Sequence, residues 1–170
     1  MKRRTWMLGT AGAAAALAGV AWQQRRAPTG EPASPTLWQL RLARPEGGEL
    51  DFASLRGAPL LLNFWATWCA PCIKEMPELD QFQREYAPQG WRVVGVAVDN
   101  PGAVRDFLKK APVSYAIGLA GFDGSQLSRD LGNDKGGLPF TVLIDRAGAV
   151  RQRRAGQIHL AELKAWAADL

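Results

Sequence analysis

The sequence predicts one α/β domain built around a largely buried sheet. Three apolar runs, at residues 60–65, 91–98 and 139–144, have the length and the valine, leucine and aromatic content of strands buried on both faces. Between and after them, apolar residues recur every three or four positions, as they do in helices that pack on a sheet. Strand and helix therefore alternate along the 170 residues, which is the pattern of an α/β fold.

The segment before the first buried strand predicts a β-hairpin. Apolar and polar residues alternate over 37–42, which favours a half-buried strand. Gly47-Gly48 then provides a turn into a second strand at 49–52. Residues 57–59, Gly-Ala-Pro, stop any helix before the chain enters the first buried strand.

After the first buried strand, Met76, Leu79 and Phe82 recur at helical spacing and predict a helix that ends near Tyr86. The later elements continue the alternation. They are a helix over 101–111, a short strand over 115–119, a short helix over 125–131, a hairpin turn at 145–148, a returning strand over 149–155 and a closing helix over 160–170.

The formal net charge of +5 belongs to the N-terminal end of the chain. Five of the 21 basic residues precede the first acidic residue, Glu31, and the other 16 are matched by 16 acidic residues. The body of the chain is therefore neutral, so its composition gives no reason to expect a nucleic-acid partner.

Residues 1–26 predict an export segment. A basic start is followed by an uncharged run at 6–22, in which Ala, Gly and Leu dominate. This fits either a cleaved signal peptide or a short uncleaved membrane anchor. The pair Arg3-Arg4 fits an ordinary basic start better than a twin-arginine signal. Either interpretation places the domain outside the cytoplasm.

The domain boundary follows from a proline-rich stretch after this leader. Residues 27–36 contain three prolines among small and polar residues, which predicts a linker. The folded domain is therefore expected over 37–170.

The chain has only two cysteines, Cys69 and Cys72, and they lie between the first buried strand and the helix after it. Two residues separate them, so they can close into a small disulfide ring and reopen, a reversible two-electron, two-proton couple. Pro71 suits the first turn of that helix. Unpaired backbone N–H groups and the positive end of the helix dipole favour a thiolate there. The pattern predicts a redox-active pair.

Other uses of two cysteines fit less well. Zinc needs about four ligands, and beyond these thiols the chain offers one histidine, His159. Haem attachment needs a histidine directly after the second cysteine, where Ile73 stands. A purely structural disulfide stays open, although so short a loop would give little entropic stabilisation.

The motif WCAPC after an NFWAT strand resembles the thioredoxin superfamily. The leader, Glu75 three residues after Cys72, and the later run GLPFTVLIDRAG narrow the resemblance to the TlpA/ResA-like group of exported thiol–disulfide oxidoreductases, which have a redoxin or thioredoxin-like domain. This resemblance covers roughly residues 37–170. It implies a thioredoxin-like fold, with a central mixed sheet flanked by helices, an N-terminal β-hairpin and an inserted helix and strand at about 101–119.

The resemblance also implies roles around the two cysteines. Cys69 looks like the attacking cysteine, exposed and of lowered pKa, and Cys72 like the more buried resolving cysteine. Pro139 matches the family's cis-proline, which would leave the Leu138 backbone free to pair with an extended substrate. The expected substrate-binding residues are Trp68, Ala70, Pro71, Leu138 and Pro139.

Glu75 is the third expected catalytic residue. It follows Cys72 at i+3 on the same helix face, where partial burial would raise the pKa of its carboxyl and let it carry a proton for Cys72. Asn63 stands where cytoplasmic thioredoxins have a buried aspartate, and an amide cannot titrate, which strengthens the case for Glu75. The competing interpretation is a solvated helix glutamate.

We therefore expect an enzyme: an exported reductase of protein disulfides, with no metal and no cofactor beyond the Cys69–Cys72 couple. By resemblance, its substrates are apocytochrome c thiols or other periplasmic proteins. Its electron donor is a membrane thiol carrier, and it is a monomer in the periplasm or cell envelope, free or held to the inner membrane by its leader. Three alternatives stay open: a thiol oxidase of the same fold, a peroxiredoxin-like thiol peroxidase, and a non-catalytic binding or metallochaperone module.

Overall fold

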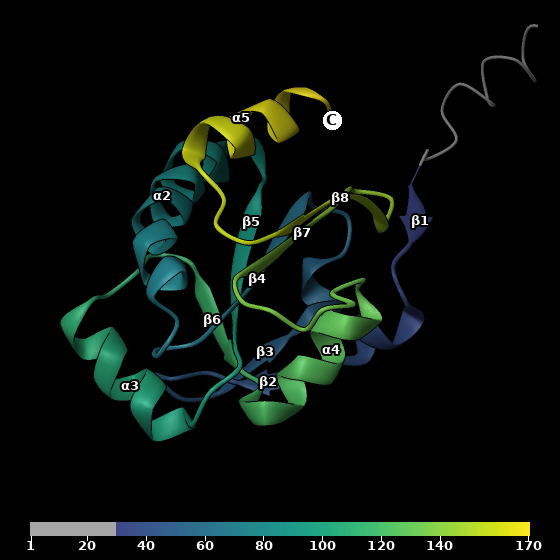
Figure 1. Ribbon diagram of the computed structural model, residues 1–170. Coiled ribbons are helices and arrows are strands. Elements are labelled where there is room, and N and C mark those ends of the chain that lie inside the picture. The colour runs from purple at the N-terminus through teal and green to yellow at the C-terminus, as the bar shows by residue number, and fades with distance from the viewer. Residues whose placement is uncertain (1–29) are drawn as a thin grey trace, which may run out of the picture.

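The computed structural model describes residues 30–170, which form a mixed sheet with helices on both faces (Figure 1). The predicted leader, residues 1–26, lies outside the described residues. The strands are β1 (Glu31–Pro32), β2 (Arg41–Ala43), β3 (Glu49–Asp51), β4 (Leu60–Trp65), β5 (Arg92–Ala97), β6 (Ala116–Leu119), β7 (Phe140–Ile144) and β8 (Ala149–Ala155). The α-helices are α2 (Ala70–Tyr86), α3 (Pro101–Lys110), α4 (Gly124–Asp130) and α5 (Leu160–Ala168). Short 3₁₀ helices are η1 (Pro35–Gln39), η2 (Phe52–Leu55), η3 (Ala87–Gln89) and η4 (Gly121–Asp123).

The sheet has the strand order β1-β8-β7-β4-β5-β6-β2-β3, with β4 near its centre. Strand β4 pairs in parallel with β5 and antiparallel with β7, so the predicted mixed sheet is confirmed. The predicted N-terminal hairpin is β2–β3, which joins the sheet through the contact of β2 with β6. The predicted insertion is α3 followed by β6, which pairs in parallel with β5.

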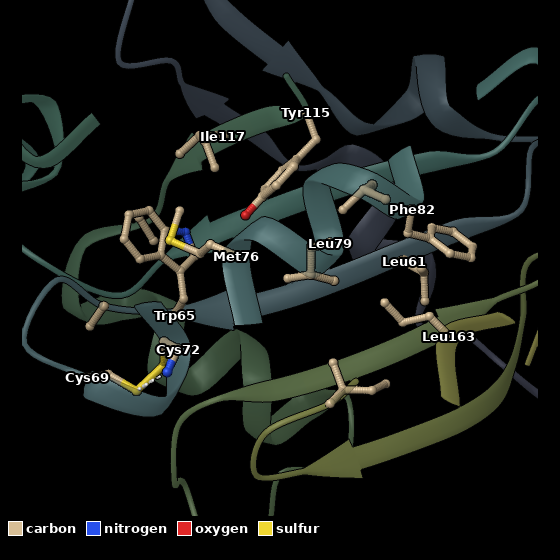
Figure 2. Packing of buried hydrophobic residues seen from close by; sticks show 14 of the residues in the cluster. Leu61, Trp65, Cys69, Cys72, Met76, Leu79, Phe82, Tyr115, Ile117 and Leu163 are labelled. Carbon is tan, nitrogen blue, oxygen red and sulfur yellow. Dashed lines mark hydrogen bonds between the residues drawn. A yellow bond between two sulfur atoms is a disulfide. The ribbon is translucent and has the colours of Figure 1, made fainter. Parts of the chain in front are cut away.

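Strand β4 divides the core into two apolar clusters. All six of its residues are buried, and alternate side chains point to opposite faces of the sheet. Leu61 and Trp65 pack with residues of α2, α3 and α5, the cluster that Figure 2 shows. Leu60, Leu62 and Phe64 pack on the other face, with η1, η2 and the partly buried Leu127 of α4. A continuous apolar run is required because helical elements cover both faces.

Helix α2 spans the length that its apolar repeat predicts. Leu79 and Phe82 on its inner face are fully buried against the sheet. The helix passes directly into η3, and Gly90 ends this segment with a φ of 89°, a conformation that a side chain would oppose. The chain is thereby turned back into β5, which lies beside β4.

The strand predicted over 37–42 is wrong in its first half, where the chain forms η1. Ser34 caps this turn by accepting a hydrogen bond from the Thr36 N–H, and Pro35 fits its first position. Leu37 and Trp38 are adjacent, yet both are buried in the same cluster. A strand would send these neighbouring side chains to opposite faces, whereas a helical turn lets both reach the core.

Part of the predicted linker is packed on the domain. Residues 31–32 form β1, which pairs antiparallel with β8, and the Ala33 N–H donates to the Gly148 carbonyl over 2.9 Å. Ala33 is buried. A linker over 27–36 therefore does not describe residues 31–36. Composition suggested a linker because three prolines stand among small and polar residues, but β1 is an edge strand, where proline is tolerated.

Among residues 30–170, no helix is both long enough and apolar enough to span a membrane.

Candidate active site at the start of helix α2

Cys69 and Cys72 form a disulfide where β4 ends and α2 begins, with 5.3 Å between their Cα atoms (Figure 2). Cys69 is 5% exposed and Cys72 is fully buried. The relative order of burial is as expected. The expectation of an exposed Cys69 is wrong for this oxidised form, because both cysteines pack into the apolar cluster under α2.

The start of α2 sets the electrostatics of the pair. Cys69 is the N-cap residue, and its Sγ accepts a hydrogen bond from the Cys72 N–H over 3.3 Å. Pro71 occupies the first turn, where its missing N–H costs nothing. The unpaired N–H groups and the positive end of the helix dipole favour negative charge on Cys69 once the disulfide opens.

The residues expected to bind substrate form two groups, one beside the cysteines in the chain and one just before β7. Trp68, Ala70 and Pro71 are exposed, and Trp68 is 67% accessible, a large value for an indole. Leu138 is half-buried and precedes a cis peptide bond to Pro139, so the expected cis-proline is confirmed. Within the described chain, the Leu138 N–H and carbonyl enter no backbone hydrogen bond.

Glu75 is fully buried on the inner face of α2, so a solvated helix glutamate is not what the structure shows. Its two carboxyl oxygens face different donors. Oε1 accepts from Asn63 Nδ2 over 2.6 Å, and Oε2 accepts from the Ile158 N–H over 2.8 Å. Burial raises the pKa of Glu75 from 4.5 to about 7, although both hydrogen bonds act in the opposite direction.

Two partners of this carboxyl were not predicted from the sequence. Ile158 contributes a backbone N–H from the segment between β8 and α5, which no side-chain pattern can reveal. Thr141 on β7 accepts a hydrogen bond from Asn63 over 3.0 Å. Thr141 and Asn63 are each the single polar residue of an otherwise apolar buried strand, and that shared feature could have signalled their pairing.

Glu78 and His159 lie at the edge of this site. The Glu78 carboxylate accepts from the Leu160 N–H and lies 3.0 Å from His159 Nδ1, so it caps the start of α5. The hydrogen bond from Leu160 lowers the pKa of Glu78. His159 is exposed, as expected. In residues 30–170, no group of three or more His, Cys, Asp or Glu side chains is arranged to hold a metal ion.

A mixed sheet with a Cys-x-x-Cys disulfide at the start of the helix after its central strand, and a cis-proline before β7, defines a thioredoxin-like protein with a redox-capable cysteine pair. The Redoxin family model matches residues 24–166, and the chain belongs to this family. The match confirms the expected redoxin domain.

Named relatives show which members of the Redoxin family this chain is similar to. The chain is 30% identical to the thiol-disulfide oxidoreductase ResA of Bacillus cereus over 114 residues, which are 66% of this chain and 63% of the relative. It is 38% identical to the thiol:disulfide interchange protein DsbE of Vibrio cholerae over 121 residues, which are 69% of this chain and 60% of the relative. The chain thus spans a little under two thirds of the length of these relatives. The expected TlpA/ResA-like relationship is confirmed.

Solved structures confirm the thioredoxin-like fold. A thiol:disulfide interchange protein of the thioredoxin family from Chlorobium tepidum superposes with a TM-score of 0.66 at 29% identity, covering 82% of this chain and 93% of that one. The structure of MTB dsbF in mixed oxidised and reduced forms gives a TM-score of 0.68 at 28% identity, covering 79% and 97%.

Proposed function

We propose that this protein is a thiol–disulfide oxidoreductase that reduces disulfides in other proteins with the Cys69–Cys72 couple. One observation carries the proposal: the two cysteines form a disulfide at a helix start, one helical turn before the buried carboxyl of Glu75. The names of the ResA and DsbE relatives support the same chemistry.

The reduction proceeds in two exchange steps. The Cys69 thiolate attacks one sulfur of the substrate disulfide, which forms a mixed disulfide and releases the other substrate sulfur as a thiolate that takes a proton. The Cys72 thiolate then attacks the Cys69 sulfur, breaks the mixed disulfide and releases the second substrate thiol. Two electrons pass to the substrate, and the protein is left in the oxidised form of this structure. A dithiol donor then restores the reduced pair by the reverse exchange.

Glu75 serves the second step by accepting the proton of the Cys72 thiol. Both residues lie on the buried face of α2, where bulk water does not supply a base. A carboxyl with a pKa of about 7 can accept and return a proton near neutral pH. Glu75 is therefore a base for the resolving thiol and an acid on the return path.

The substrate lies across the exposed Trp68, Ala70 and Pro71 and the half-buried Leu138, which precedes the buried Pro139. An extended polypeptide pairs with the free N–H and carbonyl of Leu138, in the manner of an added strand. The exposed indole of Trp68 supplies apolar contact beside the reacting sulfur. Because backbone pairing carries no sequence information, this surface accepts many proteins that hold a cysteine in an extended segment.

The predicted leader and the family support a setting outside the cytoplasm. We infer a domain in the periplasm or cell envelope, held to the inner membrane if the leader is uncleaved. It acts as a monomer, receives electrons from a membrane thiol carrier, and reduces apocytochrome c or other exported proteins. The neutral body of the chain gives no charge preference among such substrates.

The reduction potential of the pair tests the direction of the reaction. The full chain is equilibrated in graded thiol–disulfide buffers, and free thiols are counted by alkylation. We expect a midpoint near or below about −250 mV, which is typical of reductases. A midpoint of about −120 to −180 mV would instead indicate an oxidase or isomerase. A pair that does not cycle would leave only a binding module, and rapid oxidation of Cys69 by hydrogen peroxide would indicate a peroxidase.

A further inference from the structure

Three polar side chains are buried together between α2 and the sheet: Glu75, Asn63 of β4 and Thr141 of β7. Each is fully inaccessible to solvent. The Asn63 amide nitrogen donates to Glu75 Oε1 over 2.6 Å and to Thr141 Oγ1 over 3.0 Å. The Asn63 Oδ1 atom is buried without any hydrogen-bond partner. Both hydrogen bonds of this amide thus come from its nitrogen, while its oxygen accepts none.

A buried carbonyl oxygen that accepts no hydrogen bond costs free energy, because it has lost its bonds to water. Such a group in a folded protein calls for an explanation. The explanation lies in the symmetry of the carboxamide, whose oxygen and nitrogen exchange places when the group rotates by half a turn. In the observed orientation the amide donates to an ionised Glu75. After rotation, Oδ1 would accept the proton of a neutral Glu75 carboxyl, and it would also accept the Thr141 hydroxyl proton, because a hydroxyl both donates and accepts.

The position of the carboxyl proton is fixed by the second donor. The Ile158 N–H can only donate, so a proton on Oε2 would have no acceptor in this partner, whereas a proton on Oε1 can be donated to the rotated Asn63 amide. The proton therefore resides on Oε1, the oxygen that faces Asn63. Each orientation of the amide leaves one of its two polar groups without a partner, so the number of hydrogen bonds favours neither orientation. The protonation state of Glu75 then decides between them.

We infer that Asn63 is a positioning residue that reverses its amide when Glu75 gains or loses its proton, with Thr141 as the second partner in both orientations. The inference rests on the proposed role of Glu75 as the proton carrier for Cys72. A fixed donor such as lysine would stabilise only the ionised carboxyl, and a fixed acceptor would stabilise only the neutral one. An amide that reverses satisfies both forms and lets the proton come and go.

Other titratable groups face Glu75 from three elements. Glu78 lies on α2, His159 precedes α5, and Tyr115 precedes β6. Glu78 and His159 are near the surface, where solvent screens their charges, and burial raises the pKa of Tyr115 so that its phenol stays neutral. Asn63 is therefore the group in contact with Oε1 whose hydrogen bonding can follow the proton.

The experiment uses the oxidised full chain, in which the cysteines do not titrate and the carboxyl of Glu75 can be followed alone. Neutron diffraction from deuterated crystals at pH 5 and pH 9 distinguishes the amide nitrogen from the amide oxygen. We expect the ND₂ group of Asn63 to face Glu75 Oε1 at pH 9. At pH 5 we expect Oδ1 to face a deuterated Oε1. The same amide orientation at both pH values would overturn the inference.

Carbon-13 NMR of the Glu75 carboxyl in variants gives a second readout. Asn63→Leu removes the amide at similar volume. A fixed donor stabilises only the ionised carboxyl, so its loss would lower the acid dissociation constant of Glu75 by about tenfold or more. An amide that reverses hydrogen-bonds both forms, so we expect the constant to change by less than about tenfold. Asn133→Leu is the matched control, since Asn133 is a buried amide with two acceptors of its own, Ser128 and Gly137, and should leave that constant unchanged. A fall of about tenfold or more in Asn63→Leu that is absent from Asn133→Leu would show that Asn63 is a fixed donor, and the inference would then be wrong.

The two proposals fail in different ways. If the amide keeps one orientation while Glu75→Gln still slows disulfide exchange, the proton role of Glu75 stands and the reversal of Asn63 is wrong. If Glu75→Gln exchanges at the wild-type rate, the proposed role of Glu75 is wrong, whichever way the amide points.

Discussion

Glu75 is the residue on which the proposed proton chemistry depends. Its environment contains effects that raise its pKa and effects that lower it. Burial under α2 opposes its ionised form, while Asn63 and the Ile158 N–H stabilise that form. The balance leaves the pKa of the carboxyl at about 7. A carboxyl whose pKa lies near neutral pH can both accept and donate a proton during catalysis. A carboxyl that only receives hydrogen bonds from donors, without burial, would stay ionised at that pH.

Replacing this carboxyl tests its role in catalysis. In Glu75→Gln we expect the resolving step to slow by about 10²- to 10⁴-fold, the usual contribution of a general base. The inflection near pH 7 in the pH–rate profile should disappear. Stopped-flow measurement of single turnovers with a model disulfide checks both outcomes. Glu78→Gln is the control, because the lowered pKa of Glu78 keeps it ionised across this range. Profiles of equal shape for wild type and Glu75→Gln would contradict the prediction.

The same carboxyl makes stability depend on pH. The folded state raises the pKa of Glu75 from 4.5 to about 7, so it binds the proton more tightly than the unfolded chain does. Its contribution to stability is therefore fully present below about pH 4.5 and is lost as the pH rises to 7, a change of about 3 kcal/mol.

Urea unfolding of the oxidised protein at pH 5 and pH 8 measures this loss. We expect the free energy of unfolding to decrease over this interval more steeply in the wild type than in Glu75→Gln, which carries no titrating group at position 75. Parallel changes in the two proteins would show that the folded state does not raise this pKa.

At the scale of elements, Asp80 ties the insertion to helix α2. Its Oδ1 accepts from the Ser114 N–H and hydroxyl over 2.5 and 2.6 Å, and its Oδ2 pairs with Arg84. Ser114 lies between α3 and β6, so these contacts fix the end of the insertion against the helix that carries Cys72 and Glu75.

Removing this contact should loosen the insertion. We expect Asp80→Ala to lower the free energy of unfolding by about 2–3 kcal/mol, because the Ser114 donors lose a charged and mostly buried acceptor. Hydrogen exchange at the Ser114 amide should accelerate in the same variant. Asp106→Ala removes an exposed ion pair with Lys109 and should change stability by less than about 0.5 kcal/mol. Equal effects of the two substitutions would refute the special role of Asp80.

For the whole molecule, the folded unit begins before the residue that composition suggests. Edge strand β1 pairs with β8, Ala33 is buried, and Glu31 forms an ion pair with Arg153. These contacts close the sheet on the β8 side, the side opposite to the hairpin β2–β3.

Truncation locates this boundary. A chain that begins at residue 37 should be less stable by about 1–2 kcal/mol than one that begins at residue 30, because it loses the β1–β8 hydrogen bonds and the burial of Ala33. Thermal unfolding of both chains makes the comparison. Coincident melting curves would mean that residues 31–36 add nothing to the fold.

Local patterns in the sequence determined the alternation of elements, the extent of α2 and the joint that holds Cys69 and Cys72. These features depend on near neighbours, since helical spacing, apolar runs and proline positions act over a few residues. The cis-proline and the candidate role of Glu75 came from the resemblance to a family. The turn η1 was missed because six alternating residues do not distinguish a strand from a helical turn that buries two adjacent side chains.

Only the tertiary structure decided the environment of Glu75. Its partners Asn63 and Ile158 stand 12 and 83 residues away in the chain, and Thr141 is 78 residues from Asn63. Sheet pairing places Asn63 directly opposite Thr141, and the segment after β8 brings the Ile158 N–H over α2. Burial of a carboxyl and the count of its donors depend on such distant groups. The amino-acid sequence therefore determined which groups can react, and the fold decided the proton affinity of those groups.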